Sequence, residues 1–200
     1  KEEELLNGYL EATNESYAIA KIAGLKLCQA LRDQYNFDCI SLMPTNLYGP
    51  GDNYNPKSSH VLAALIHKFH IATELSSPTV NCLGTGSPFR EFLYADDLGE
   101  AVVFALENWD PSCPNAPLDN NNKPLLFLNV GTGVDISIHE LAHKIASIYS
   151  YKGDICWDST KPNGTPKKLL DINHIKKMGW KPKINLDEGL RKTIFDYQSK

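Results

Sequence analysis

Residues 11–50 follow a pattern that few folds can accommodate. Apolar residues recur at three- and four-residue steps through residues 11–33, which predicts an amphipathic helix. Residues 37–44 form a short apolar run typical of a buried parallel strand, and residues 45–59 form a long loop rich in Gly, Pro and Asn. Open α/β sheets bind ligands in loops at the carboxyl ends of their strands. The pattern therefore predicts an α/β fold with a functional site after this strand.

The rest of the chain continues the alternation of helices and strands. We expect further helices at residues 60–72, 95–108, 138–149, 171–178 and 186–197, and further strands at residues 80–83, 89–94, 125–130 and 154–158. Ser137 and Glu140 have the spacing of a capping box, which marks the start of the third of these helices.

Composition narrows the choice of partners. The net charge is −4 and the isoelectric point about 5.9, which argues against a nucleic acid or an anionic membrane as the main partner. No apolar run approaches the length of a membrane-spanning helix. The five cysteines contain no Cys-x-x-Cys pair, which indicates free thiols and a cytoplasmic location. His139 and His143 are four residues apart, but no third ligand is evident, so we predict no metal site.

Tyr17 and Lys21 are the first candidates for catalysis. A step of four residues places them on one face of the predicted helix, one turn apart. An ammonium group close to a phenol favours the phenolate form, so the pair can exchange a proton with a carbonyl or an alcohol. Many structural helices also contain a Tyr and a Lys at this spacing. The small residues around the pair favour the functional interpretation, because they allow another surface to approach closely.

A dinucleotide-binding fingerprint is missing from the chain. No Gly-x-Gly-x-x-Gly or Gly-x-x-Gly-x-x-Gly follows a predicted strand, and the pyrophosphate of a dinucleotide needs such a turn at the start of a helix. If the chain belongs to a dinucleotide-dependent enzyme, we expect the phosphate-binding βα units to lie in an N-terminal part that precedes Lys1.

Several motifs resemble one enzyme family. YAIAK, PTNLYGPGDN, REFLYADD and NVGTG resemble the extended short-chain dehydrogenase/reductase superfamily of nucleotide-sugar enzymes. SSHVLAALIHKFH and KPNGTPKKLLD are more specific and resemble its GDP-L-fucose synthase group. The resemblance covers essentially all 200 residues. It implies the C-terminal part of a Rossmann-type NADP(H)-binding fold with a smaller α/β substrate domain.

The resemblance implies roles for residues of the catalytic and cofactor sites. Tyr17 is expected as the acid–base catalyst at a sugar C4 carbonyl, with Lys21 as its partner and a ligand of the nicotinamide ribose. The segment PTNL, formed by Pro44, Thr45, Asn46 and Leu47, matches the loop that packs against the nicotinamide. His60 matches a cofactor-contacting residue that moves protons at C3 and C5. Imidazole suits this task because it titrates near neutrality. A Ser and a Cys that complete the family's site would precede Lys1.

The resemblance also implies four ligands for a GDP-sugar: Lys68, Leu83, Arg90 and Asn163. Arg90 would pair with the diphosphate, which suits a guanidinium fork. The other three depart from the family's pattern. Lys68 stands where relatives often have Arg, Leu83 where some have an aromatic residue, and Asn163 where the residue is often acidic.

The expected function is NADPH-dependent 3,5-epimerisation and 4-reduction of a GDP-4-keto-6-deoxy sugar. Residues 1–50 and 87–150 are expected on the Rossmann side, and residues 51–86 and 151–200 on the nucleotide-sugar side. A homodimer through the helix that carries Tyr17 and Lys21 is also expected. Two alternatives remain: another nucleotide-sugar epimerase or dehydratase, or a truncated binding module without turnover. We expect the 200-residue chain by itself to be inactive.

Overall fold

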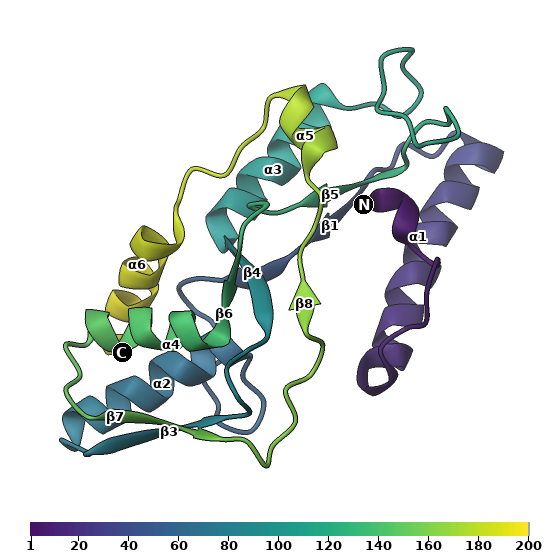
Figure 1. Ribbon diagram of the computed structural model, residues 1–200. Helices are drawn as coiled ribbons and strands as arrows, with labels where there is room; N and C mark the ends of the chain where they lie inside the picture. Colours follow the sequence, from purple (N-terminus) through teal and green to yellow (C-terminus); the bar gives the residue numbers. More distant parts are fainter. Residues whose placement is uncertain (200) are drawn as a thin grey trace. The chain divides into compact units, whose positions relative to one another are not determined.

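The computed structural model describes residues 1–199, and the chain divides into two compact units, whose elements are labelled in Figure 1. Unit 1 consists of Lys1–Thr45, Leu98–Gly133 and Leu170–Lys181, and unit 2 of Asn46–Asp97, Val134–Leu169 and Pro182–Lys200. Neither unit is one continuous stretch of sequence, so each is assembled from segments that are far apart in the chain.

Unit 1 is built on two parallel strands, β1 (Ser41–Pro44) and β5 (Phe127–Val130). All four residues of β5 are buried, and helix α5 (Asn173–Met178) packs against this strand. The unit also contains the 3-10 helices η1 (Glu2–Glu4) and η2 (Ala12–Asn14), helix α1 (Glu15–Tyr35) and most of helix α3 (Ala95–Asn108). The parallel pairing confirms the strand type predicted for residues 37–44, and β5 confirms that a strand lies within residues 125–130.

Strand β1 is shorter and less buried than the sequence predicted. The expected strand covered residues 37–44, but only Ser41–Pro44 pair with β5, and none of these four residues is fully buried. Among the described residues β5 is the only partner of β1, so the other edge of β1 has no strand to cover it. Ahead of the strand, the Cys39 thiol donates to the carbonyl of Cys28 at 3.3 Å.

Helix α1 begins four residues later than predicted, at Glu15 rather than residue 11. The Glu11 carboxylate accepts the backbone N–H of Thr13, and the residues that follow form the 3-10 turn η2 before the α-helix starts. No residue of α1 is buried, and its apolar Ile19 and Leu27 are 52% and 60% exposed. The apolar stripe of this helix therefore has little cover within unit 1.

Unit 2 contains two small sheets. In the first, β4 (Phe89–Tyr94) is flanked by β2 (Asn46–Tyr48), β6 (Asp135–Ser137) and β8 (Lys167–Lys168), and only β6 is antiparallel to it. In the second, β3 (Thr79–Leu83) and β7 (Asp154–Asp158) pair in parallel. Helices α2 (Val61–Glu74), α4 (Ile138–Ile148) and α6 (Leu186–Gln198) complete the unit.

The core of unit 2 lies among these helices and the sheets. Each helix contributes one apolar face, as its periodicity predicted. Strand β3 contributes alternate residues, and strand β4 contributes successive residues. Fully or almost fully buried side chains in this core are Leu62, Ile66 and Phe69 of α2, Leu141 and Ile145 of α4, Leu190 and Ile194 of α6, and Val80 and Cys82 of β3.

Three short strands were not predicted. They are β2, β6 and β8, with three, three and two residues. So few residues carry no recognisable alternation, and each strand exists because β4 supplies its hydrogen-bonding partner. The prediction of a loop over residues 45–59 was therefore wrong for the first residues of that range, because Asn46–Tyr48 form β2.

Other predicted boundaries are confirmed. Strands β4 and β7 and helix α3 have the expected limits, and α5 ends at Gly179, whose φ of 114° lies in the left-handed region. Both hydrogen bonds of the Ser137–Glu140 capping box are present. The Ser137 hydroxyl and backbone N–H hold the pKa of Glu140 below its usual value. None of the described helices has the length and apolar character required to cross a membrane.

The two units do not follow the division expected from the sequence. Of the expected segment 1–50, residues 1–45 lie in unit 1, but residues 46–50, 87–97 and 134–150 join unit 2, and residues 170–181 join unit 1. Asp97 shows how distant segments of unit 2 are held together. Its buried carboxylate accepts the backbone N–H groups of Lys183 and Ile184, both at 3.0 Å. The cofactor and substrate roles assigned to each half remain predictions.

Two glycines give a stability prediction with a matched control. A Cβ at the buried Gly189 of α6 would overlap the phenol of Tyr48, whereas a Cβ at Gly99 of α3 would meet no atom within 4 Å. We expect Gly189→Ala to destabilise the chain by about 1–3 kcal/mol through overpacking. We expect Gly99→Ala to stabilise it by about 0.5–1 kcal/mol, because alanine loses less backbone entropy in a helix. Urea unfolding followed by circular dichroism measures both, and equal effects of the two substitutions would contradict the packing described.

Candidate active site

Tyr17 and Lys21 lie on α1 in unit 1, as predicted. The Lys21 ammonium nitrogen is 5.5 Å from the centroid of the Tyr17 ring, and the Tyr17 side chain is 67% exposed. Among the described residues, neither polar group has a hydrogen bond or an ion pair with another side chain. The phenol and the ammonium are therefore adjacent and accessible, which is the geometry that proton exchange with a bound carbonyl requires.

The predicted nicotinamide loop, Pro44 to Leu47, lies where the chain passes from unit 1 to unit 2. Pro44 ends β1, and the backbone N–H of Thr45 donates to the carbonyl of Val130 at 2.9 Å. Asn46 and Leu47 belong to β2, and the Asn46 amide donates to the carbonyl of Glu91 at 2.8 Å. Each end of the segment is thus tied to a strand of its own unit.

His60 occupies the N-cap position of helix α2 in unit 2. It has extended backbone angles, and its side chain makes no capping hydrogen bond. Its carbonyl accepts the N–H of Ala64 at 2.9 Å, so the backbone starts the helix while the exposed imidazole stays free to react. The preceding loop is held by a hydrogen bond of 3.0 Å from the Asn53 amide to the Ser58 hydroxyl.

A pocket in unit 2 brings together three of the four predicted substrate ligands. Leu83, Arg90 and Asn163 line a cavity of about 220 Å³, although they come from β3, β4 and the loop after β7. The remaining lining residues were not predicted: Val61, Gly86, Pro88, Ile138 and Pro162. They give the cavity apolar walls, and Val61 directly follows His60 at the start of α2. No sequence pattern marked them, because apolar and proline residues at element ends are common.

Asn163 connects the two loops that form this pocket. Its side-chain oxygen accepts the backbone N–H of Thr85 at 2.7 Å and the Thr85 hydroxyl at 3.1 Å. The turn around Thr85 also needs glycine, since Gly84 and Gly86 have φ angles of 76° and 73°. A Cβ at Gly86 would come within 2.7 Å of the Trp157 ring. The turn is therefore fixed by Asn163 on one side and by Trp157 on the other.

Arg90 is the strongest candidate in the pocket for binding an anion. Its guanidinium donates to the carbonyl of Phe89 at 2.7 Å, and no described carboxylate forms an ion pair with it. Partial burial lowers the pKa of Arg90, because desolvation disfavours the charged form. A bound anion would compensate for this desolvation, which makes the site complementary to a phosphate group.

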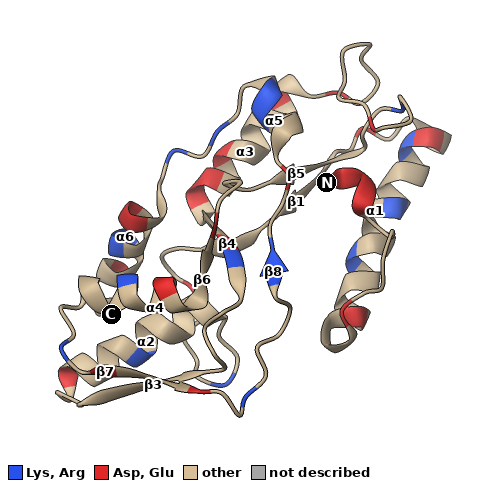
Figure 2. Ribbon diagram, viewed as in Figure 1, with Lys and Arg blue, Asp and Glu red and all other residues tan. Residues whose placement is uncertain are grey.

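A second cation lies beside Arg90 on the neighbouring strand. Lys168 of β8 is the direct register partner of Arg90 in β4, so the two side chains lie on the same face of the sheet. Figure 2 shows the blue arrow of β8 beside β4, which carries a blue segment. Lys167, the other residue of β8, pairs with Asp135 at 3.1 Å instead. No sequence pattern predicted that Lys168 lies beside Arg90, because only the pairing of β8 with β4 places it there; Lys168 is not among the residues that line the cavity.

Lys68, the fourth predicted ligand, does not line this pocket. It lies on α2, and its ammonium donates to the carbonyl of Asn81 in β3 at 2.7 Å. The lysine thus joins a helix to a strand of the same unit, and a substrate role would require this bond to break. Its assignment to the nucleotide-sugar remains a prediction.

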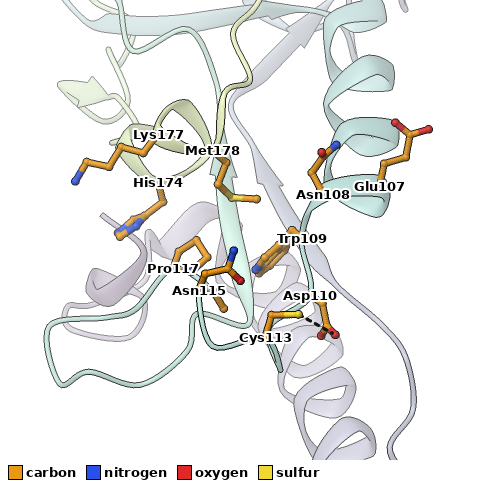
Figure 3. Close-up of a pocket in the computed structure, with 11 residues that line it drawn as sticks. Glu107, Asn108, Trp109, Asp110, Cys113, Asn115, Pro117, His174, Lys177 and Met178 are labelled. Atoms are coloured by element: carbon orange, nitrogen blue, oxygen red, sulfur yellow. Dashed lines mark hydrogen bonds between the residues drawn. The ribbon is translucent and has the colours of Figure 1, made fainter.

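A larger cavity, of about 630 Å³, lies in unit 1 and contains none of the predicted site residues. Figure 3 shows its lining, from the end of α3 with Trp109, from the following loop with Asp110 and Cys113, and from α5. The loop residues precede β5, whereas ligands of parallel sheets bind beyond the carboxyl ends of strands. The larger cavity is therefore not our candidate for the active site, although it has the greater volume. The predicted ligands in the smaller pocket of unit 2 favour that pocket instead.

These features define a class of protein. Parallel strands, a helix with an exposed Tyr–Lys pair, and a small pocket with a cationic lining are typical of Rossmann-type enzymes that act on nucleotide-linked substrates. The chain belongs to the NAD dependent epimerase/dehydratase family, whose model matches residues 1–115. The α/β fold and the superfamily predicted from the sequence motifs are thereby confirmed.

Individual proteins are also similar to this chain in sequence or in structure. The chain is 50% identical to probable GDP-L-fucose synthase 1 of Oryza sativa subsp. japonica and 49% identical to GDP-L-fucose synthase of Escherichia coli K12. Each match covers 96% of this chain, which spans 55% and 59% of the length of these two relatives. The structure of GDP-mannoheptose C4 reductase from Campylobacter jejuni with NADP bound is similar, with a TM-score of 0.82 and 31% identity. That match covers 99% of this chain and 64% of the reductase.

Proposed function

We propose that this chain supplies the Tyr–Lys pair and the nucleotide-sugar pocket of an NADPH-dependent GDP-4-keto-6-deoxy-D-mannose 3,5-epimerase/4-reductase, which forms GDP-L-fucose. The observation that carries the proposal is the pocket of unit 2, where Leu83, Arg90 and Asn163 line one cavity. Their assignment came from the resemblance to the family, and one cavity of this chain brings the three together although they are distant in the sequence. The two relatives named GDP-L-fucose synthase support the same substrate.

In this proposal, Tyr17 donates its proton to the C4 oxygen as the carbonyl is reduced. Lys21 favours the phenolate that remains and holds the nicotinamide ribose. His60 moves protons at C3 and C5, which are acidic because they lie next to the C4 ketone. Arg90 and Lys168 bind the diphosphate, and the apolar walls exclude water around it.

The cofactor NADPH supplies a hydride when bound. The accessible Lys21 ammonium and the segment Pro44–Leu47, with each end hydrogen-bonded to a strand of its own unit, suit its nicotinamide end. The chain contains no glycine fingerprint for the pyrophosphate, so its residues fit only that end. The NADP bound to the Campylobacter jejuni reductase supports this choice of cofactor.

Arg90→Lys tests the nucleotide-sugar pocket. Lysine keeps the positive charge but lacks the planar guanidinium with its paired N–H donors. The diphosphate should therefore lose one charge-assisted hydrogen bond of about 1.5–3 kcal/mol. We expect GDP to bind roughly 10–100 times more weakly to the variant, measured by calorimetric titration. Arg191→Lys, at an exposed position of α6, is the control and should bind GDP as the unchanged chain does. If Arg90→Lys and the control bound GDP with equal affinity, the diphosphate would not bind in this pocket.

A second candidate is the 4-reduction of another GDP-4-keto sugar, which the similarity to GDP-mannoheptose C4 reductase favours. The discriminating assay supplies GDP-4-keto-6-deoxy-D-mannose and NADPH to an enzyme that combines this chain with a glycine-rich phosphate loop. Nuclear magnetic resonance of the product then distinguishes the two functions. GDP-L-fucose supports the proposal, and a product reduced at C4 with unchanged C3 and C5 supports the second candidate.

We further propose that α1 forms a contact between two copies of the chain. Its exposed apolar residues Ile19 and Leu27 support this, because a stripe of this kind is usually covered by a partner surface. Light scattering of the chain gives its mass in solution. A monomer at micromolar concentration would speak against this contact.

A further inference from the structure

Two consecutive glutamates of unit 1 meet a histidine that is far from them in the sequence. Glu2 and Glu3 lie in η1, and His174 lies in α5. One ligand atom from each residue can be chosen so that all three lie within 4.8 Å of one another. Figure 2 shows η1 as an acidic turn, and Figure 3 shows His174 projecting from α5. We propose that these three residues bind a divalent transition-metal cation, for which Zn²⁺ is the best match.

Burial of the two carboxylates is the main argument. Glu2 is only 2% exposed, and its Oε1 accepts the backbone N–H of Asn129 at 3.0 Å. Its other oxygen, Oε2, is buried without any hydrogen-bond partner, and the same is true of Oε2 of Glu3. A buried carboxylate oxygen that is neither hydrogen-bonded nor paired with a cation is costly. Two such oxygens beside one imidazole therefore indicate a position where a cation is bound.

The surroundings provide room and orientation for an ion. Glu2, Glu3 and His174 line a cavity of about 170 Å³ together with residues that include Asp171 and Lys177. No described lysine or arginine forms an ion pair with either glutamate, so the carboxylates are not already neutralised. The Asn129 N–H orients the Glu2 carboxylate from behind, in the manner of the outer-shell donors that fix metal ligands.

The donor set selects the type of metal. Carboxylate oxygens with an imidazole nitrogen suit Zn²⁺, whereas Mg²⁺ and Ca²⁺ prefer oxygen ligands alone. Ligands at about 2.0–2.2 Å from a tetrahedral Zn²⁺ lie roughly 3.4 Å apart. The three ligand atoms all lie within 4.8 Å of one another, so no pair has to close by more than about 1.4 Å on binding. Three protein ligands leave a fourth position for water. The ion would join η1 to α5, and through Asn129 to β5, so its role is to stabilise unit 1.

Calorimetric titration of the 200-residue chain with ZnCl₂ tests the proposal. The N-terminus is acetylated, because Lys1 lines the same cavity and a free amino group could act as a ligand. We expect one Zn²⁺ per chain at this site and no heat from MgCl₂ under the same conditions. Zn²⁺ should also raise the midpoint of thermal unfolding. Absence of Zn²⁺ binding in the unchanged chain would overturn the proposal.

The variants assign the site. His174→Asn and Glu3→Gln should each weaken Zn²⁺ binding at least tenfold and remove the rise in the unfolding midpoint. Circular dichroism establishes whether each variant is folded. If His174→Asn does not fold, the Zn²⁺ affinity of Glu3→Gln is the result that tests the site. The control replaces both His139 and His143 with Asn, because these exposed residues of α4 have ring centroids 4.6 Å apart and could chelate an ion themselves. Binding that survives Glu3→Gln but is lost in the control would place the ion on α4 and refute the site.

Discussion

Tyr17→Phe is expected to reduce the rate of 4-reduction by about 10²–10⁴-fold, the usual contribution of a positioned acid–base group. Phenylalanine keeps the ring and the shape of the helix surface but cannot donate a proton to the C4 oxygen. The hydroxyl acts in the transition state, so kcat should fall while the affinity for the GDP-sugar stays nearly constant. The measurement is NADPH consumption by an enzyme that combines this chain with a glycine-rich phosphate loop.

Tyr35→Phe is the matched control for Tyr17→Phe. Tyr35 is the last residue of the same helix and is 72% exposed, compared with 67% for Tyr17. Its substitution removes the same atom from the same type of surface, so the reduction rate should stay within about twofold of the unchanged enzyme. Reduction at a normal rate by Tyr17→Phe would show that another group protonates the C4 oxygen. An equal loss in both variants would indicate damage to α1 and not lost catalysis.

His60→Gln is expected to slow proton exchange at C3 and C5 by a similar factor, about 10²–10⁴-fold. Glutamine retains hydrogen-bonding capacity at the start of α2 but cannot exchange a proton near neutral pH. The His60 side chain makes no capping bond, so the helix should not suffer from its loss. Incorporation of solvent deuterium at C3 and C5 measures the exchange directly.

The 4-reduction provides an internal control for His60→Gln. A substrate that has already been epimerised at C3 and C5 should be reduced at nearly the normal rate, because Tyr17 carries that step. His143→Gln, at an exposed position of α4, should leave both steps unchanged. Normal deuterium incorporation by His60→Gln would mean that His60 only begins the helix, and a loss of both steps would mean that it binds the cofactor or substrate more generally.

The local elements of this fold follow from local chemistry. Helix α3 and strands β4 and β7 have the limits that periodicity predicted, and the capping box of Ser137 and Glu140 sets the start of α4. Short-range interactions within a few residues determine these features, so a window of sequence contains the information. Strands β2, β6 and β8 are different, because each has two or three residues and depends on β4 for its partner.

The active-site prediction divides in the same way. Tyr17 and Lys21 are one helical turn apart, so the sequence determined that they lie on one face, and their separation of 5.5 Å from ring to ammonium agrees. Arg90 and Asn163 could be placed in one pocket only by resemblance, because no local pattern connects residues so distant in the chain. The sequence did not predict that Lys168 pairs with Arg90 or that Lys68 bonds to Asn81, because both depend on contacts between distant segments; neither lysine lines the pocket.

The sequence by itself determined the class of fold, most helices and strands, and the residues with the chemistry for reduction and epimerisation. Only the tertiary structure decided how the chain divides into units, which loops form the pocket with Arg90, and that Glu2 and Glu3 meet His174. The physical reason is the distance along the chain over which each kind of interaction acts. Backbone periodicity and capping act over a few residues, whereas strand pairing, burial and the meeting of charges depend on segments separated by tens to hundreds of residues.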